Sequence, residues 1–181
     1  MDPAIALQSI GFLTDFRESA MVYPIVMATH LTCIALFGGM ILLTDLRLLG
    51  VALTSTPVSD VVNGLRWWKR IGFVIMVGCG LMLACSEAVK YAPNPFFWAK
   101  MGLLFLVGVH AVAFKPEVYD HPEKLDSGLT SKAKVAAWCS LIIWISLPIM
   151  GRLIAYYEPK DKNLQPAQAQ VQVLTPEIAR K

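Results

Sequence analysis

The sequence has few charged residues for its length. Aspartate, glutamate, lysine and arginine make up 16% of the 181 residues, whereas soluble domains are about one-quarter charged. Apolar residues make up 56%, so there is too little polar surface to cover a fold that faces water on every side. This shortage of charge excludes an ordinary water-soluble domain and indicates that lipid surrounds much of the chain. The small net charge of +3 gives no sign of a nucleic-acid partner.

The motifs of soluble enzymes and metal sites are also missing. The sequence contains no G-x-S-x-G, no phosphate loop and no H-E-x-x-H, and we expect no independent catalytic site. The four cysteines lack the spacing of metal ligands and each lies inside an apolar run, so we expect small buried hydrophobic residues: Cys33, Cys79, Cys85 and Cys139. The first twenty residues lack a basic stretch followed by a long apolar run, so we expect no cleavable signal peptide.

What the sequence does contain is four apolar runs, each long enough to cross a bilayer. A helix needs about 20 mostly apolar residues to cross roughly 30 Å of hydrocarbon. The four runs cover about residues 21–43, 68–86, 96–114 and 135–156. Because every backbone donor in lipid needs a partner within its own segment, these runs predict helices. The predicted fold class is an all-α integral membrane protein, with a bundle of four transmembrane helices in residues 20–157.

The two ends of the chain differ from this membrane domain. In residues 1–19, Asp2 and Pro3 are typical of a helix start. Apolar residues then fall roughly on one helical face: Ile5, Ile10, Leu13 and Phe16. This pattern predicts a short amphipathic helix on the membrane surface, with a frayed terminus as the alternative. Residues 158–181 are polar and bury too little to fold alone, so they predict an extended tail that docks on partner subunits.

Lysine and arginine are distributed unevenly between the two sides of the predicted bundle. Eight lie around the connections between the first and second runs and between the third and fourth: Arg47, Arg66, Lys69, Arg70, Lys115, Lys124, Lys132 and Lys134. The opposite side has four near the spans: Arg17, Lys90, Lys100 and Arg152. Because cytoplasmic loops are enriched in these residues, we expect both termini to face the periplasm or exterior.

Three stretches resemble a family of small four-helix bacterial inner-membrane proteins of unknown function. His30-Leu31, Gly38-Gly39 and residues 44–50 (TDLRLLG) are similar to that family's first span. Residues 86–88 (SEA) and 91–101 (YAPNPFFWAKM) resemble its second loop, and residues 151–156 (GRLIAY) resemble its closing motif. The resemblance covers about residues 18–157 and implies a multi-pass protein of the bacterial inner membrane. It supplies no reaction, and His110 stands where the family often has asparagine.

Two histidines inside the predicted spans are the main candidates for function. An ionisable residue at the bilayer centre costs roughly 2.5 to 3.5 kcal/mol on insertion scales, so His30 and His110 need a reason to be there. Two membrane histidines on neighbouring helices can hold a haem iron from both faces, as in the larger four-helix cytochromes b. Arg17 and Arg152, on one predicted side, could then pair with the haem propionates. The sequence therefore predicts haem b as a cofactor.

The spacing also leaves other ligand pairs open. Counted from the same side, His30 lies about nine residues into its span and His110 about fourteen, a depth mismatch of roughly 7 Å. Met76 lies at nearly the depth of His30 and is an alternative second ligand. In the structural alternative, each histidine hydrogen-bonds a neighbouring helix. Further charged residues near the same face are either interfacial ion pairs or a headgroup or quinone site: Arg17, Glu18, Glu87, Lys100 and Arg152.

Three functions therefore stay open from the sequence. The first is a haem b-binding membrane subunit that passes electrons between the quinol pool and a periplasmic redox partner. The second is a non-catalytic structural or anchor subunit of a larger membrane complex. The third is a small transporter or an ion-conducting oligomer, although no inverted repeat is visible.

Overall fold

The computed structural model describes residues 3–157, and within that range every regular element is a helix. In chain order the elements are α1 Pro3–Gln8, α2 Gly11–Glu18, α3 Val22–Leu49, α4 Val58–Ser86, α5 Ala88–Tyr91, α6 Pro95–Lys115, the π-helical turn η1 Pro116–Asp120, the 3₁₀ turn η2 Pro122–Leu125, and α7 Ser131–Tyr156. Four of them are long and apolar enough to cross a membrane: α3, α4, α6 with η1, and α7. The predicted all-α fold with four transmembrane helices is confirmed.

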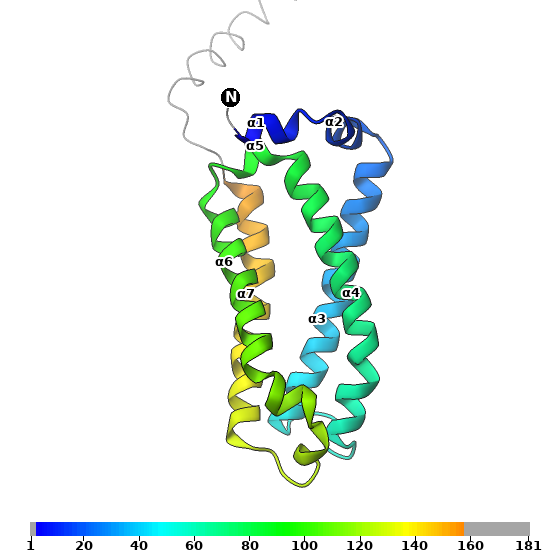
Figure 1. Cartoon of the computed structure of the whole chain (residues 1–181), viewed down its shortest axis with the longest axis vertical. Coiled ribbons are helices and arrows are strands. Elements are labelled where there is room, and N and C mark those ends of the chain that lie inside the picture. The colour runs from blue at the N-terminus through cyan, green and yellow to red at the C-terminus, as the bar shows by residue number, and fades with distance from the viewer. Residues whose placement is uncertain (1–2, 158–181) are drawn as a thin grey trace, which may run out of the picture.

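The four long helices run side by side, as Figure 1 shows. The inner pair, α3 and α7, pack against each other, while α4 packs mainly on α3 and α6 mainly on α7. The short helices α1, α2 and α5 lie across one end of the bundle, which we call the cap end. Residues 50–57 and 116–130 connect the long helices at the opposite end, which we call the loop end. Because the number of long helices is even, α3 begins and α7 ends at the cap end.

Local sequence explains where the long helices begin and end. Helix α3 stops at Gly50, which adopts a φ of 73° and donates its N–H to the carbonyls of Arg47 and Leu46. Only glycine adopts this left-handed conformation without strain. Helix α6 begins after Asn94, whose side chain accepts the N–H of Phe96, and α7 begins after Thr130, which caps it in the same way.

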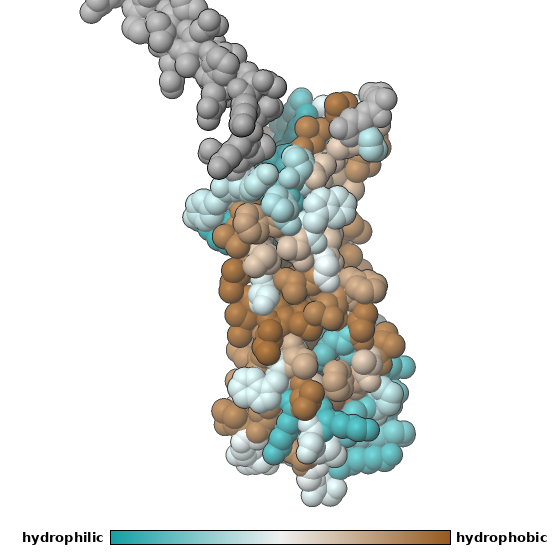
Figure 2. Space-filling view, turned by 90° about the vertical axis from the view of Figure 1, so that its left-hand side faces the viewer, coloured by the Kyte–Doolittle hydropathy of each residue, from teal (hydrophilic) through white to brown (hydrophobic). Residues whose placement is uncertain are grey.

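Large apolar side chains face outward along the middle of the long helices. Phe105 and Val112 on α6 are each 75% exposed, and Figure 2 shows a hydrophobic belt across the α6–α7 side with hydrophilic residues gathered at the loop end. Lipid is the solvent that such a belt requires. Exposed tryptophans mark the edge of the belt nearer the loop end. Trp68 lies 18 residues from Ser86, the cap-end residue of α4, and Trp138 lies 18 residues from Tyr156, the cap-end residue of α7. That separation is about 27 Å at 1.5 Å per residue, close to the hydrocarbon thickness of roughly 30 Å.

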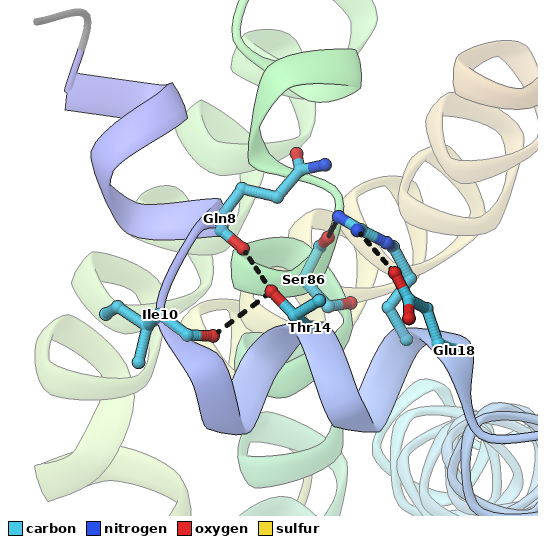
Figure 3. Close-up of polar contacts among 6 residues, drawn as sticks. Gln8, Ile10, Thr14, Glu18 and Ser86 are labelled. Carbon is cyan, nitrogen blue, oxygen red and sulfur yellow. Dashed lines mark hydrogen bonds and ion pairs between the residues drawn. The ribbon is translucent and has the colours of Figure 1, made fainter.

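The N-terminal segment forms two short helices, α1 and α2, where the sequence predicted one. Leu13 and Phe16 of α2 are buried, whereas Asp15 and Glu18 are exposed, so α2 is amphipathic as predicted. Figure 3 shows how polar contacts tie this segment together: the hydroxyl of Thr14 donates to the carbonyls of Gln8 and Ile10 at 3.3 and 3.4 Å. The predicted polar tail of residues 158–181, and its docking on partner subunits, lies outside the described residues.

Helices α3 and α4 extend further toward the loop end than the predicted spans. The sequence placed the end of the first span near residue 43, whereas α3 continues to Leu49. It placed the start of the second span near residue 68, with a helix from Thr56-Pro57 leading into it, and α4 is one continuous helix from Val58. The extra turns pack into a buried core at the loop end. It consists of Leu48, Val58, Val62, Val118, Leu125, Ala133, Ala136 and Ala137. This core holds the connecting turns η1 and η2 against the bundle and forms the base on which the cavity described next is built.

Candidate functional site

A cavity of about 390 Å³ lies among the four long helices, in the half of the bundle nearer the loop end. The lining residues nearest the bundle middle are mainly aromatic or aliphatic. Phe37 on α3 packs against Trp144 on α7, with ring centroids 5.1 Å apart, and against Phe73 on α4 at 6.0 Å. The lining residues nearer the loop end are mostly charged or polar. The cavity is therefore amphipathic along the membrane normal, with an apolar inner part and a polar outer part.

Lys69 is the buried cation of the polar part. Its side chain extends from α4 and is only 7% exposed. Its ammonium group donates to the hydroxyl of Thr44 on α3 at 3.1 Å and lies 5.3 Å from the ring centroid of Tyr119. Thr44 in turn donates to the carbonyl of Met40 at 2.9 Å. A cation over an aromatic face and against a hydroxyl is stabilised without a surrounding shell of water, so Lys69 can stay inside the bundle.

Asp45 and Arg66 line this cavity, and each has one buried side-chain atom without a hydrogen-bond partner. Asp45 on α3 is 5% exposed and lies near Ser140 on α7, yet its Oδ2 is buried with no hydrogen-bond partner. Arg66 on α4 donates from Nη2 to the carbonyl of Tyr119 at 2.6 Å, and its Nε is also buried without an acceptor. Buried polar groups in folded proteins are nearly always hydrogen-bonded, so both atoms point to an interaction that the chain itself does not make.

Positive charge exceeds negative charge around the cavity. Its lining includes four cationic and two acidic residues: Arg66, Lys69, Arg70, Lys115, Asp45 and Asp120. One pair is matched, since Lys115 lies 3.7 Å from Asp120. Low-dielectric walls concentrate the field of the surplus charge in the cleft. The cavity is therefore suited to an anion rather than to a cation.

The two histidines predicted as haem ligands lie against different helices. Nδ1 of His30 donates to the carbonyl of Met76 on α4 at 2.9 Å. The ring of His30 presses on Gly80, where a Cβ atom would come 2.9 Å from Cε1, so the close approach of the ring requires glycine. His110 lines the cavity and donates from Nε2 to the carbonyl of Ala136 on α7 at 2.9 Å. The structure thus brings His30 and Met76 together, through the backbone of Met76, and it does not place His30 in the cavity with His110.

The two arginines predicted to pair with propionates interact with their own neighbours at the cap end. Arg17 donates to the carbonyl of Ser86 at 3.4 Å and pairs with Glu18 at 3.5 Å, contacts that Figure 3 draws. Arg152 donates to the hydroxyl of Tyr156 at 2.6 Å and lies over its ring. Neither arginine lines the cavity. The haem set named from the sequence is spread over the cap end, the bundle middle and the cavity, and it stays a prediction.

The charged residues of the cavity were noticed in the sequence only as markers of membrane orientation. A signal for their role was present on α4, because Arg66, Lys69, Arg70 and Phe73 follow the i, i+3, i+4, i+7 spacing of one helical face. Tyr119 and Ser140 have no such signal. They reach the same cavity from η1 and α7 only through the tertiary fold.

Comparison with known proteins gives one match. A family model described as "Family of unknown function (DUF6644)" matches residues 11–157, a range that contains all four long helices and every residue that lines the cavity. The resemblance to a family of unknown function is therefore confirmed. Searches of curated proteins and of solved structures found no match.

Proposed function

Because this chain belongs to the Family of unknown function (DUF6644), whose description supplies no activity, we propose from the cavity that it is a membrane-embedded binding subunit for an anionic amphiphile. The observation that supports this proposal is the amphipathic lining. An apolar inner part formed by Phe37, Phe73 and Trp144 meets an outer part with a surplus of positive charge. An acyl chain or other apolar body suits the first part, and a phosphate or carboxylate suits the second.

The depth of the cavity supports a ligand drawn from the bilayer. Its charged residues Arg66, Lys69 and Arg70 flank Trp67 and Trp68 on α4, and both tryptophans are more than 60% exposed. Exposed tryptophans concentrate at the membrane–water interface, which is also the level of lipid headgroups. We place the loop end in the cytoplasm because it has eight of the lysines and arginines near the spans, against four at the cap end. The ligand then comes from the cytoplasmic leaflet.

The proposal is tested by lipid binding to the purified chain in neutral detergent, measured by native mass spectrometry. The two probes are dioleoyl phosphatidylmethanol, which is anionic, and dioleoyl phosphatidylcholine, which is zwitterionic. We expect the anionic lipid to bind at least about tenfold more tightly, the effect of one charge-assisted hydrogen bond of ~1.4 kcal/mol. Equal binding of both lipids would reject the proposal.

A matched pair of variants locates that preference. Arg70→Gln removes an exposed cation that lines the cavity, and Lys132→Gln removes an exposed cation of the loop end that does not line it. Both variants change the net charge equally, so the general attraction of anions to the chain falls by the same amount. We expect Arg70→Gln to weaken binding of phosphatidylmethanol several-fold and Lys132→Gln to leave it near the wild-type value. Equal losses would mean that the lipid does not bind in the cavity.

A second candidate function, a haem b-binding subunit, is favoured by one contact. Nδ1 of His30 donates its N–H to the carbonyl of Met76, which leaves Nε2 as the nitrogen that would bind iron. Histidines that bind a metal through one ring nitrogen usually donate a hydrogen bond from the other. Haem b would supply one-electron transfer, here between the quinol pool and a periplasmic redox partner. The purified chain should then show a Soret band that His30→Ala abolishes and His121→Ala, in an exposed loop, retains. A colourless preparation from cells supplied with a haem precursor would reject this candidate.

A further inference from the structure

The two unpartnered atoms of the cavity differ in what they require. Nε of Arg66 is a donor and needs an acceptor oxygen. Oδ2 of Asp45 accepts a hydrogen bond when the carboxyl group is ionised and donates one when it is protonated. A hydroxyl group satisfies Asp45 in either state, because it is both a donor and an acceptor, whereas an ammonium group can only donate.

Both atoms belong to residues that line the cavity, although each atom is itself covered. Asp45 is a lining residue and so is Ser140 on α7. The terminal torsion of an aspartate side chain is broad and roughly two-fold, so the Asp45 carboxyl group can rotate to meet a polar group in the cavity. A ligand headgroup that reaches Arg66 with one oxygen can therefore present a second polar group to Asp45.

Resting on the proposed anionic-amphiphile site, we infer that the ligand is a phospholipid whose headgroup carries a free hydroxyl, the chemistry of phosphatidylglycerol. The phosphate supplies the acceptor for Arg66, and a headgroup hydroxyl supplies the partner for Asp45. The charge count favours a hydroxyl over an ammonium group. One phosphate reduces the surplus of two positive charges around the cavity to one, whereas a zwitterionic headgroup leaves it at two and places a cation near Lys69.

The test compares two anionic lipids that differ only in the headgroup alcohol, which is glycerol with two free hydroxyls in one and methanol with none in the other. Dioleoyl phosphatidylglycerol and dioleoyl phosphatidylmethanol carry the same charge and the same chains, and only the first has free hydroxyls. In native mass spectrometry of the wild-type chain, we expect phosphatidylglycerol to bind about tenfold more tightly, the gain of one hydrogen bond to a charged group. Equal binding of the two lipids overturns the inference, since Oδ2 of Asp45 is then satisfied by something other than the headgroup.

Two variants assign the effect to Asp45. Asp45→Leu has a similar shape and no hydrogen-bonding group, and we expect it to bind both anionic lipids equally. Asp60→Asn alters an exposed acidic residue of the loop end that does not line the cavity and should keep the preference. The wild-type comparison decides the question even where Asp45→Leu fails to fold. A preference that survives in folded Asp45→Leu overturns the assignment.

The outcomes separate this inference from the function on which it rests. If phosphatidylmethanol binds no better than phosphatidylcholine, the anionic-amphiphile site itself is rejected. If phosphatidylmethanol binds better than phosphatidylcholine but equals phosphatidylglycerol, only the hydroxyl requirement is overturned. Stronger binding of phosphatidylethanolamine than of phosphatidylglycerol overturns it too, because an ammonium group would then be the preferred partner of Asp45.

Discussion

At the scale of the single residue, Asp126 shows how a side chain in a connecting turn fixes the start of a membrane helix. Its two carboxylate oxygens accept the backbone N–H of Ser59 at 3.0 Å and the hydroxyl of Ser59 at 2.6 Å. Ser59 is the second residue of α4, where backbone N–H groups have no partner within the helix. The side-chain and backbone hydrogen bonds from Ser59 lower the pKa of Asp126 below its ordinary value of 3.8. The ionised carboxylate therefore stabilises the start of α4.

This contact predicts a pH-dependent loss of stability for Asp126→Asn. Because the folded-state pKa is depressed, the stabilisation is complete above the ordinary value of 3.8 and is lost as the pH falls through the folded-state value. We expect Asp126→Asn to melt at a lower temperature than the wild type near pH 6, and the difference to shrink as the pH falls below 3.8 toward pH 2. Thermal melts in detergent measure the difference, with Glu123→Gln in the same turn as the control. A difference between Asp126→Asn and the wild type that is undiminished at pH 2 would contradict this account.

Residue types alone reveal only part of the cavity. The stripe of Arg66, Lys69 and Arg70 on α4 can be found from helical spacing. Asp45 cannot be assigned in that way, because nothing in the sequence near it shows that Ser140, 95 residues later, lies near its carboxyl group. Membrane histidines, by contrast, attract attention in any sequence, and here the backbone carbonyls of Met76 and Ala136 bind them. Such carbonyl partners have no sequence signature.

At the scale of the element, Asn94 joins the start of α6 to the end of α7. It is 1% exposed, and its side chain uses both of its polar atoms. The oxygen caps α6 by accepting the N–H of Phe96 at 3.0 Å, and the amide nitrogen donates to the carbonyl of Ile154 at 3.1 Å. That carbonyl lies in the last turn of α7 and also accepts the backbone N–H of Tyr157 at 3.4 Å. One side chain thus caps the start of α6 and ties it to the end of α7 at the cap end.

This double role predicts a graded response to substitution of Asn94. Asn94→Ser keeps an oxygen that can cap α6 and loses the donor to Ile154, so we expect a loss of about 1 kcal/mol in the free energy of unfolding. Asn94→Ala loses the cap as well, which adds about 1 kcal/mol. Unfolding by sodium dodecyl sulfate in mixed micelles measures these differences. Asn63→Ala, at an exposed position of α4, should change little, and equal losses for Asn94→Ser and Asn94→Ala would refute the capping role.

The existence of the four long helices could be predicted from the sequence, and so could the start of α4, since Thr56 and Pro57 are typical of a helix start, but the end of α3 could not. A span defined by apolar residues stops where charge begins, near Asp45 on α3 and Lys69 on α4. The helices continue past both residues inside the bundle, where Lys69 donates to Thr44 and Asp45 lies near Ser140. The start of α6 was easier to predict, since Asn94 and Pro95 form a cap and a first helical residue.

At the scale of the whole molecule, the two ends of the bundle differ in what they contain. The cap end has the short amphipathic helices α1 and α2, tied to α4 through the contact between Arg17 and the carbonyl of Ser86. The loop end has the buried core under η1 and η2, most of the cationic residues, and the cavity. The cavity is lined by residues of the half of the bundle nearer the loop end. If it binds a lipid, as proposed above, the orientation of the chain decides which leaflet supplies that lipid.

Cysteine labelling tests the proposed orientation. The starting chain has the four native cysteines replaced by serine or alanine, since Cys139 is exposed. Single cysteines are then placed at exposed positions of each end, with Ser55→Cys and Ser127→Cys at the loop end and Ala92→Cys at the cap end. If the loop end faces the cytoplasm, as its surplus of lysine and arginine indicates, a membrane-impermeant maleimide added to spheroplasts labels only Ala92→Cys. Both loop-end cysteines should react once the membrane is lysed. The reverse pattern would place the cavity in the outer leaflet, and labelling of all three in intact spheroplasts would mean that the chain inserts in both orientations.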